Sequence, residues 1–146
     1  MKKRNIIIFS IILIFIDQII KYLVHNYIIS DIVIINNFFS ITNLSNYGAA
    51  FGILSNNIYF LIFISLILIY FIINEIKKNN NKGYIISLLM ILSGALGNLI
   101  DRIFRGFVVD YLSFELFSIS FPVFNFADML ITFGTIYLIY MIIKEK

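Results

Sequence analysis

The sequence predicts a membrane protein with four transmembrane helices and a small β-structure outside the membrane. Three observations support this fold class. Hydrophobic residues make up 61% of the 146 residues and charged residues only 13%, whereas soluble domains are about half apolar and about one-quarter charged. Four apolar stretches approach the roughly 17–25 residues that cross a bilayer. Two longer connections contain short segments of alternating or β-branched residues, which are typical of strands.

The four spans are predicted as helices, because an open strand cannot satisfy its backbone polar groups in lipid. They belong to a single integral membrane domain, residues 1–146, and cover approximately residues 6–24, 58–73, 84–100 and 121–143. The basic start of the chain resembles a signal peptide, but no small-residue cleavage pattern precedes Asp17. We therefore interpret the first span as an uncleaved anchor.

The distribution of basic residues predicts the orientation in the membrane. Eight of the eleven lie before the first span, between the second and third, or after the fourth: Lys2, Lys3, Arg4, Lys77, Lys78, Lys82, Lys144 and Lys146. The positive-inside rule makes these segments cytoplasmic. Both termini are then cytoplasmic, and the connections 25–57 and 101–120 are extracytoplasmic.

The outer connections are predicted to contain a small sheet. Residues 38–42 alternate in polarity and predict one short strand, and residues 106–114 and 116–124 predict two more. Residues 48–54 predict a short interfacial helix. These elements would lie on the outer surface of the membrane.

Ionisable residues at membrane depth are costly, at about 2.5–3.5 kcal/mol each on insertion scales, and therefore indicate functional positions. Asp17 and Lys21 lie four residues apart near the outer end of the first span. We interpret them as an ion pair within one helix that lets Lys21 extend outward to the membrane surface. Direct chemistry is not expected of either residue.

The end of the third span carries a second polar cluster. Asn98 and Asp101 share a helical face, and Arg102 and Arg105 follow. We expect an arginine to hold Asp101, which gives that carboxylate a structural role. Asn98 and Arg102 remain candidates for holding a substrate backbone or headgroup at the boundary between lipid and water.

Asp110 and Asp128 form the third set, and neither has a cation close in sequence. A single such residue is more often a satisfied polar group or a helix cap. Two carboxyls at the same predicted depth indicate a pair. Asn125 lies one helical turn before Asp128 and is placed to orient it.

Other catalytic chemistries are largely excluded by residue content. The chain has no Cys, its single His25 rules out motifs with two histidines, and no GxSxG is present. A Ser–Lys dyad would need Lys21, with no obvious serine to match it. Two carboxyls in contact share one proton, so one can activate water while the other hydrogen-bonds a scissile carbonyl. No metal, cofactor or nucleic acid is expected.

Two other classes of function remain open from the residues alone. Carboxylates within membranes also serve transporters and proton relays. However, the acidic residues gather at one boundary, and no inverted repeat is visible. A noncatalytic assembly factor with polar contacts between helices is the third class.

Five segments in order resemble the motifs of the lipoprotein signal peptidase (signal peptidase II) family. They are DQIIK from Asp17, NYGAAFGIL from Asn46, SGALGNLIDR from Ser93, GFVVDY from Gly106 and FNFAD from Phe124. The departures are Ser93, where the family usually has Gly, and Tyr111, where Phe is common. The resemblance covers nearly the whole chain.

The resemblance implies an aspartyl endopeptidase that removes signal peptides from diacylglyceryl-modified prolipoproteins, cutting before the lipidated Cys. It implies a bacterial cell (inner) membrane location with the active site facing outward. The implied fold is four transmembrane helices with an extracytoplasmic β-cradle and a short interfacial helix. Implied partners are lipid-modified prolipoproteins, membrane lipids and globomycin-type inhibitors.

The resemblance also implies a role for each matching residue. The catalytic pair would be Asp110 and Asp128. The positions implied to contact the substrate peptide or inhibitor are Asn46, Gly48, Asn98, Arg102 and Asn125. Support roles are implied for Asp17, Lys21 and Asp101.

Overall fold

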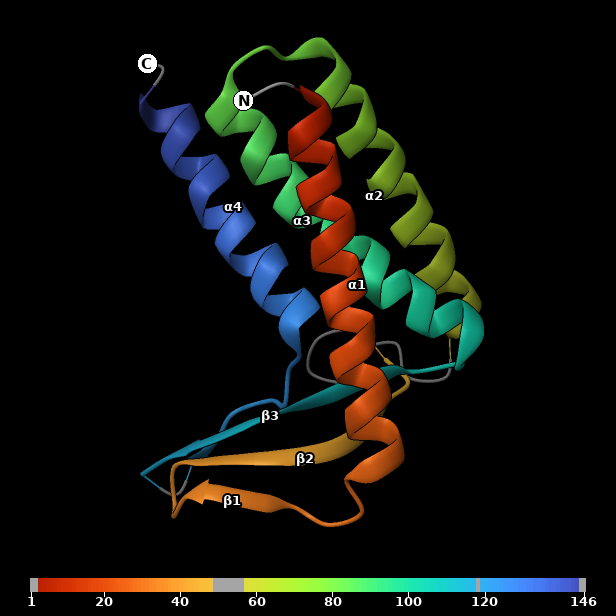
Figure 1. The fold of residues 1–146 in the computed structure, drawn as a ribbon, viewed down its shortest axis with the longest axis vertical. Coiled ribbons are helices and arrows are strands. Elements are labelled where there is room, and N and C mark those ends of the chain that lie inside the picture. The colour runs from red at the N-terminus through yellow and green to blue at the C-terminus, as the bar shows by residue number, and fades with distance from the viewer. Residues whose placement is uncertain (1–2, 49–56, 118, 145–146) are drawn as a thin grey trace.

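A helical bundle stands on a small sheet in the computed structural model, which describes residues 3–48, 57–117 and 119–144 (Figure 1). The elements are α1 (Lys3–Tyr27), β1 (Ile32–Ile35), β2 (Phe39–Asn46), α2 (Ile58–Lys78), α3 (Lys82–Phe104), β3 (Val108–Leu116), β4 (Ile119–Ser120) and α4 (Phe126–Lys144). The start of α1, the end of α4 and the α2–α3 connection lie at the end of the bundle away from the sheet (Figure 1).

All four helices are long and apolar enough to cross a membrane. The central helix is α3, which packs against α1, α2 and α4. It is the most buried of the four, whereas each of the other three exposes many large apolar side chains. Apolar exposure of this kind suits contact with lipid chains. The predicted fold class is therefore confirmed.

Small residues allow α3 and α4 to approach closely. A Cβ atom added to Gly94 would collide with the backbone oxygen of Ala127, and one added to Gly134 would lie 2.9 Å from Ile91 Cγ1. Glycines at such crossings let helix backbones come together in lipid, where no hydrophobic force drives their association. This close crossing fixes the start of α4 against the outer half of α3.

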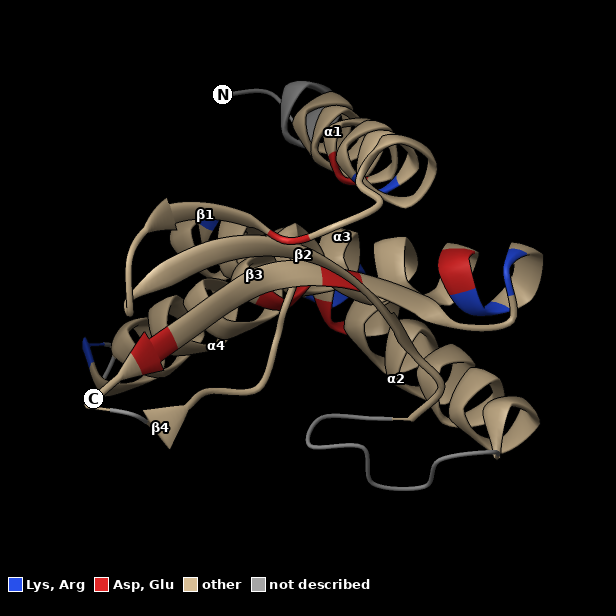
Figure 2. Ribbon diagram, turned by 90° about the horizontal axis from the view of Figure 1, so that it is seen from below, with Lys and Arg blue, Asp and Glu red and all other residues tan. Residues whose placement is uncertain are grey.

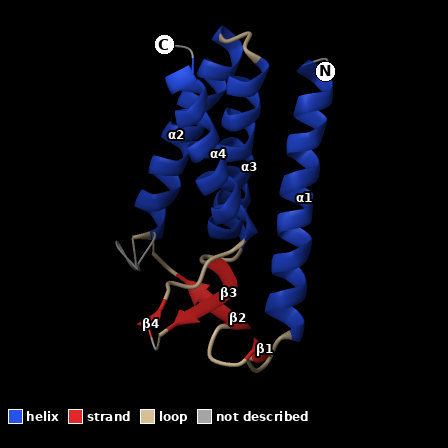
Figure 3. Ribbon diagram, turned by 90° about the vertical axis from the view of Figure 1, so that its left-hand side faces the viewer, coloured by secondary structure: helices blue, strands red, loops and turns tan. Residues whose placement is uncertain are grey.

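The sheet is antiparallel, with strand order β1-β2-β3-β4. The sheet lies beneath the bundle (Figure 3). Strand β3 crosses the ends of the helices, and the part of β3 that crosses them carries an acidic residue (Figure 2). The first four residues of β3 are all buried, because this part of the strand lies against the helices. In the β2–β3 register, Leu44 pairs with Asp110.

The segment before α4 is bound to β3. Phe124 N donates to Leu112 O at 3.1 Å, and Phe124 O accepts from Leu112 N at 2.8 Å. The Phe124 ring stacks on Phe114, which stacks in turn on Phe39. These contacts bring the first turn of α4 beside the buried part of β3.

Several element boundaries differ from the sequence prediction. Helix α4 begins at Phe126 and not near residue 121, because the preceding residues pair with β3 and Pro122 disfavours a helix there. Helix α3 continues to Phe104, and β1 was not predicted at all, although its sequence IVII is rich in β-branched residues. The predicted interfacial helix 48–54 lies outside the described residues, apart from Gly48.

Candidate active site

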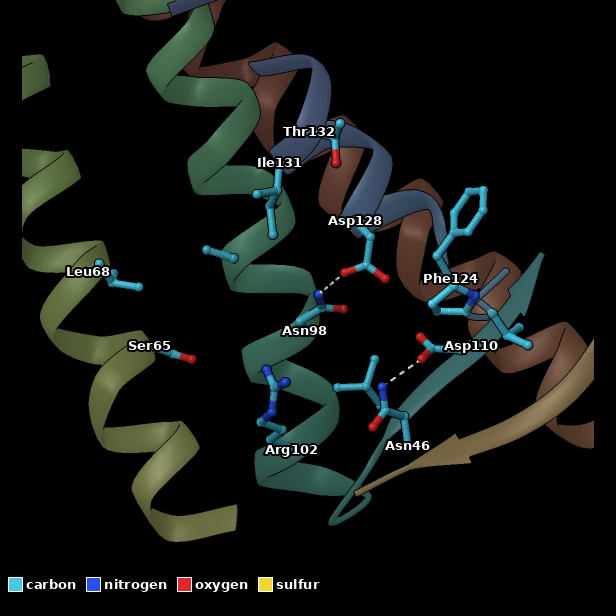
Figure 4. Close-up of a pocket in the computed structure, with 14 residues that line it drawn as sticks. Asn46, Ser65, Leu68, Asn98, Arg102, Asp110, Phe124, Asp128, Ile131 and Thr132 are labelled. Carbon is cyan, nitrogen blue, oxygen red and sulfur yellow. Dashed lines mark hydrogen bonds between the residues drawn. The ribbon is translucent and has the colours of Figure 1, made fainter. Parts of the chain in front are cut away.

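A pocket of about 410 Å³ lies at the junction of the bundle and the sheet (Figure 4). Its polar lining side chains include Asn46, Asn98, Arg102, Asp110 and Asp128. Asp110 enters from β3 and Asp128 from α4, and both carboxyls face the pocket (Figure 4). The rest of the lining is Ser65, Leu68, Ala95, Val108, Pro122, Val123, Phe124, Ile131 and Thr132.

Asn125 and Asp128 cap the N-terminus of α4 reciprocally. Asn125 Oδ1 accepts a hydrogen bond from Asp128 N at 3.0 Å, and Asp128 Oδ2 accepts one from Asn125 N at 3.2 Å. This is a capping box, which satisfies two backbone donors that the helix itself leaves without partners. The spacing of three residues therefore orients the Asp128 carboxylate as well as starting the helix.

Three asparagine amides hold the two carboxyls. Asp110 Oδ1 accepts from Asn125 Nδ2 at 2.6 Å, and Asp110 Oδ2 accepts from Asn46 Nδ2 at 2.8 Å. Asp128 Oδ1 accepts from Asn98 Nδ2 at 2.8 Å. Each of the four carboxyl oxygens thus has one N–H donor. Asn125 contacts both acids and ties them to one centre.

Burial sets the electrostatics of Asp110, whose side chain is 2% exposed. Burial raises the pKa of this carboxyl from 3.8 to about 6, the hydrogen bonds from Asn46 and Asn125 lower it, and the charge of Asp128 raises it. A carboxyl with this pKa can hold or release a proton near neutral pH, as acid–base chemistry requires. Burial also raises the pKa of Tyr111, so this side chain remains a neutral phenol.

Arg102 supplies the cation that lines the pocket. Its Nη2 donates to Gly48 O at 3.2 Å, which joins α3 to the segment after β2. Asn46 Oδ1 accepts from Gly48 N at 2.9 Å in a tight local turn. The residues expected to contact a substrate therefore surround the two acids, with Gly48 joined to them through Arg102 and Asn46.

The three predicted support residues form a buried ionic cluster behind the pocket. Lys21 Nζ contacts Asp17 Oδ2 and Asp101 Oδ2, each at 3.0 Å, and donates to Asn98 Oδ1 at 2.8 Å. Asp101 also pairs with Arg105, as expected. The prediction that Lys21 extends outward is wrong, since its side chain is fully buried and finds its partners inside the bundle.

Sequence reasoning missed two kinds of residue. Gln18 joins the ionic cluster: its Nε2 donates to Gly97 O at 3.1 Å, and its Oε1 accepts from Arg105 Nη1 at 3.0 Å. Ser65 and Thr132 line the pocket. Each is a polar residue in an otherwise apolar span, and that signal could have marked both as candidates for the pocket. Within the described ranges, no cluster of three or more His, Cys, Asp and Glu side chains is arranged to hold a metal ion.

Comparison with known proteins places the chain in a family. The profile of the family described as "Signal peptidase (SPase) II" matches residues 9–144. The chain belongs to the signal peptidase II family. Members of this family are proteases that act on lipoprotein precursors, so the chain is a hydrolase. With its four apolar helices, it is an integral membrane protein.

Individual relatives support the same assignment. The chain is 49% identical over 118 residues to "Lipoprotein signal peptidase" of Clostridium tetani, covering 79% of this chain and 76% of the relative. It is 44% identical over 133 residues to the protein of that name from Caldanaerobacter subterraneus subsp. tengcongensis, covering 89% of this chain and 90% of the relative.

Solved structures share the fold over almost the whole chain. A bacterial membrane enzyme solved by the in meso method at 2.3 Å resolution superposes with a TM-score of 0.90 at 32% identity, covering 99% of this chain and 90% of that chain. A second, at 1.9 Å resolution, has a TM-score of 0.88 at 31% identity, covering 99% and 96%.

Proposed function

We propose that the chain is an aspartyl endopeptidase that removes signal peptides from diacylglyceryl-modified bacterial prolipoproteins, cutting before the lipidated Cys. One observation carries this proposal. Asp110 and Asp128, from a strand and a helix, enter the same pocket and are both hydrogen-bonded to Asn125. Family membership supplies the substrate class, and the pair of acids supplies the chemistry.

The two acids take different roles in the first step. Asp110 holds the shared proton, because it is the more buried acid and its pKa is raised to about 6. Asp128 takes a proton from a water molecule, whose oxygen then attacks the scissile carbonyl carbon. Asp110 gives its proton to the carbonyl oxygen, and a neutral tetrahedral diol results.

The second step restores both acids. Asp128 gives its proton to the leaving nitrogen as the carbon–nitrogen bond breaks, and Asp110 takes a proton from a hydroxyl of the diol. One water is consumed, no covalent intermediate forms, and the enzyme returns to its starting protonation. Asn46, Asn98 and Asn125 hold the acids, while Arg102 and Gly48 bind the peptide backbone.

The depth of the pocket suits a lipid-modified substrate. Each buried CH₂ contributes about 0.8 kcal/mol, so a substrate with two acyl chains stays in the bilayer and the acids must work at its surface. The pocket lies between the apolar bundle and the sheet. Phe107 and Phe114, at the start and along the length of the β3 region, are aromatic residues of the kind that suit this boundary. Membrane lipids would surround it, and globomycin-type inhibitors would occupy it.

The proposed orientation is multi-pass in the bacterial cell (inner) membrane, with cytoplasmic termini and an outward-facing site. The basic residues support it, since the start of α1, the α2–α3 connection and the end of α4, in or beside which most of them lie in the sequence, are opposite the sheet (Figure 1). The chain, residues 1–146, would form one integral membrane domain.

Purified protein in detergent, incubated with a diacylglyceryl-modified prolipoprotein, tests the proposal. We expect cleavage that Asp110→Asn and Asp128→Asn each abolish, with far-UV circular dichroism unchanged. Asp31→Asn is the matched control, because Asp31 is an exposed acid in the outer connection, and it should cleave normally. Cleavage retained in either test variant would refute the assignment of Asp110 and Asp128 as the catalytic pair. Equal cleavage of the unlipidated precursor would refute the proposal that the enzyme recognises the lipid modification.

A further inference from the structure

The orientation of the three asparagine amides is the starting point. Each presents its Nδ2 group to a carboxyl of the pair. An asparagine amide has nearly the same shape when its oxygen and nitrogen are exchanged, so hydrogen bonds at its other end decide which atom faces the carboxyl. What fixes the far end of each amide therefore fixes the donors around both acids.

Two of the amides are fixed by nearby backbone. Asn46 Oδ1 accepts from Gly48 N, and Asn125 Oδ1 accepts from Asp128 N. Asn98 is different, because it lies inside α3, where the neighbouring backbone N–H groups already bond within the helix. Its orientation depends on donors from elsewhere: Lys21 Nζ of α1 donates to its Oδ1 at 2.8 Å, and the more distant Asn125 Nδ2 donates at 3.3 Å.

We propose that Lys21 is a positioning residue: its ammonium holds the Asn98 amide with Nδ2 toward Asp128, and so orients that carboxylate for reaction. The inference rests on the proposed function. A reversed amide would place Asn98 Oδ1 against Asp128 Oδ1 and its NH₂ group against the ammonium. Both contacts are repulsive, so the lysine strongly favours the observed orientation.

The three contacts of the Lys21 ammonium show that it does more than balance the charges of Asp17 and Asp101. An ammonium has three N–H donors, and Asp17 and Asp101 use two of them at 3.0 Å. The third donor makes the shortest of the three contacts, and it goes to the uncharged Asn98, which lines the pocket. Asp17 also accepts from Ala127 N at 3.0 Å, next to Asp128 in the chain. The cluster thus places α1, α3 and α4 around one carboxylate.

Lys21→Met tests the inference, with Arg105→Met as the matched control. Arg105 is the other cation of the cluster and contacts Asp101 and Gln18. We expect Lys21→Met to lower kcat about 10- to 100-fold on the lipid-modified precursor, the range found when a group that orients a reacting ligand is removed. KM should change less than threefold, and Arg105→Met should keep kcat within threefold. Equal kcat losses in both variants would overturn the inference.

A double-mutant cycle with Asn98→Ala gives a second test. If Lys21 acts through Asn98, adding Lys21→Met to Asn98→Ala lowers kcat no further. Losses that multiply would overturn the inference. If Lys21→Met alone does not fold, Asp17→Asn/Lys21→Met replaces it, because this pair removes an anion together with the cation, and the same comparisons are made against Asp17→Asn.

Wild-type cleavage separates this inference from the proposed function. No cleavage of the lipid-modified precursor by the wild type, or cleavage by Asp110→Asn, would refute the proposed function itself. Wild-type cleavage that depends on both acids, together with a normal kcat in Lys21→Met, would refute only the role of Lys21.

Discussion

The Asp110→Asn substitution should lower the free energy of unfolding at acidic pH and raise it at neutral pH. In the folded protein the pKa of Asp110 is raised from 3.8 to about 6 by burial. The folded state therefore binds this proton more tightly than the unfolded state does. The wild type keeps its full stability below pH 3.8, loses stability as pH rises toward 6, and changes no further from this group above that.

The size of the effect follows from the shift. At 1.36 kcal/mol for each pKa unit, the ionised carboxyl costs the wild type at most about 3 kcal/mol above pH 6. Asp110→Asn removes that loss. However, its NH₂ group must face one of the two amide donors, Asn46 or Asn125, which costs about 1 kcal/mol of hydrogen bonding at every pH. The variant should be about 1 kcal/mol less stable at pH 3.5 and about 2 kcal/mol more stable at pH 7.

The free energy of unfolding can be measured by SDS titration in mixed micelles, followed by far-UV circular dichroism from pH 3.5 to 7.5. The informative quantity is the difference between variant and wild type, because other titrating groups largely cancel in it. Asp31→Asn should show no such crossing, since Asp31 is exposed. A difference for Asp110→Asn that stays constant with pH would refute burial as the main influence on this carboxyl.

Three further predictions follow from the site and the helix contacts. If Asp110 must hold its proton to start the reaction, kcat/KM declines above about pH 6, and a rate that is flat from pH 5 to 8 would contradict this role. Gly94→Ala should lower the free energy of unfolding by about 1–3 kcal/mol, because the new Cβ collides with the backbone of α4. Gly83→Ala should cost less, because its new Cβ meets the flexible end of Met141. Equal costs for the two variants would contradict the packing argument. Ser10→Ala and Ser93→Ala should show a coupling of about 0.6 kcal/mol in a double-mutant cycle, since their hydroxyls bond at 2.5 Å between α1 and α3, and strictly additive effects would show that this bond contributes nothing.

Much of the architecture could be predicted, because lipid imposes simple requirements. Apolar stretches of sufficient length gave four helices, and alternation gave strands at β2 and β3. The errors occur at boundaries. Helix α4 starts late because Phe124 bonds to Leu112 of β3, and hydropathy carries no signal for that pairing.

The candidate site was predictable in its residue types but not in its contacts. Polar side chains in an apolar chain marked Asp17, Lys21, Asn98, Asp110 and Asp128, because such residues cannot face lipid without penalty. Their partners lie far away in sequence. The hydrogen bonds that Asn46 makes to Asp110 and Lys21 makes to Asn98 span 64 and 77 positions. No local pattern could have shown that Lys21 points inward and not toward the membrane surface.

The sequence by itself determined that this chain enters a membrane, which residues would be too polar for lipid, and that its motifs follow the order of one protease family. The tertiary structure alone decided which donor meets each carboxyl oxygen and which amide depends on a lysine from another helix. The physical reason is that a low-dielectric interior requires every polar group to have a partner. The packing of three helices and a strand decides which partner is within reach.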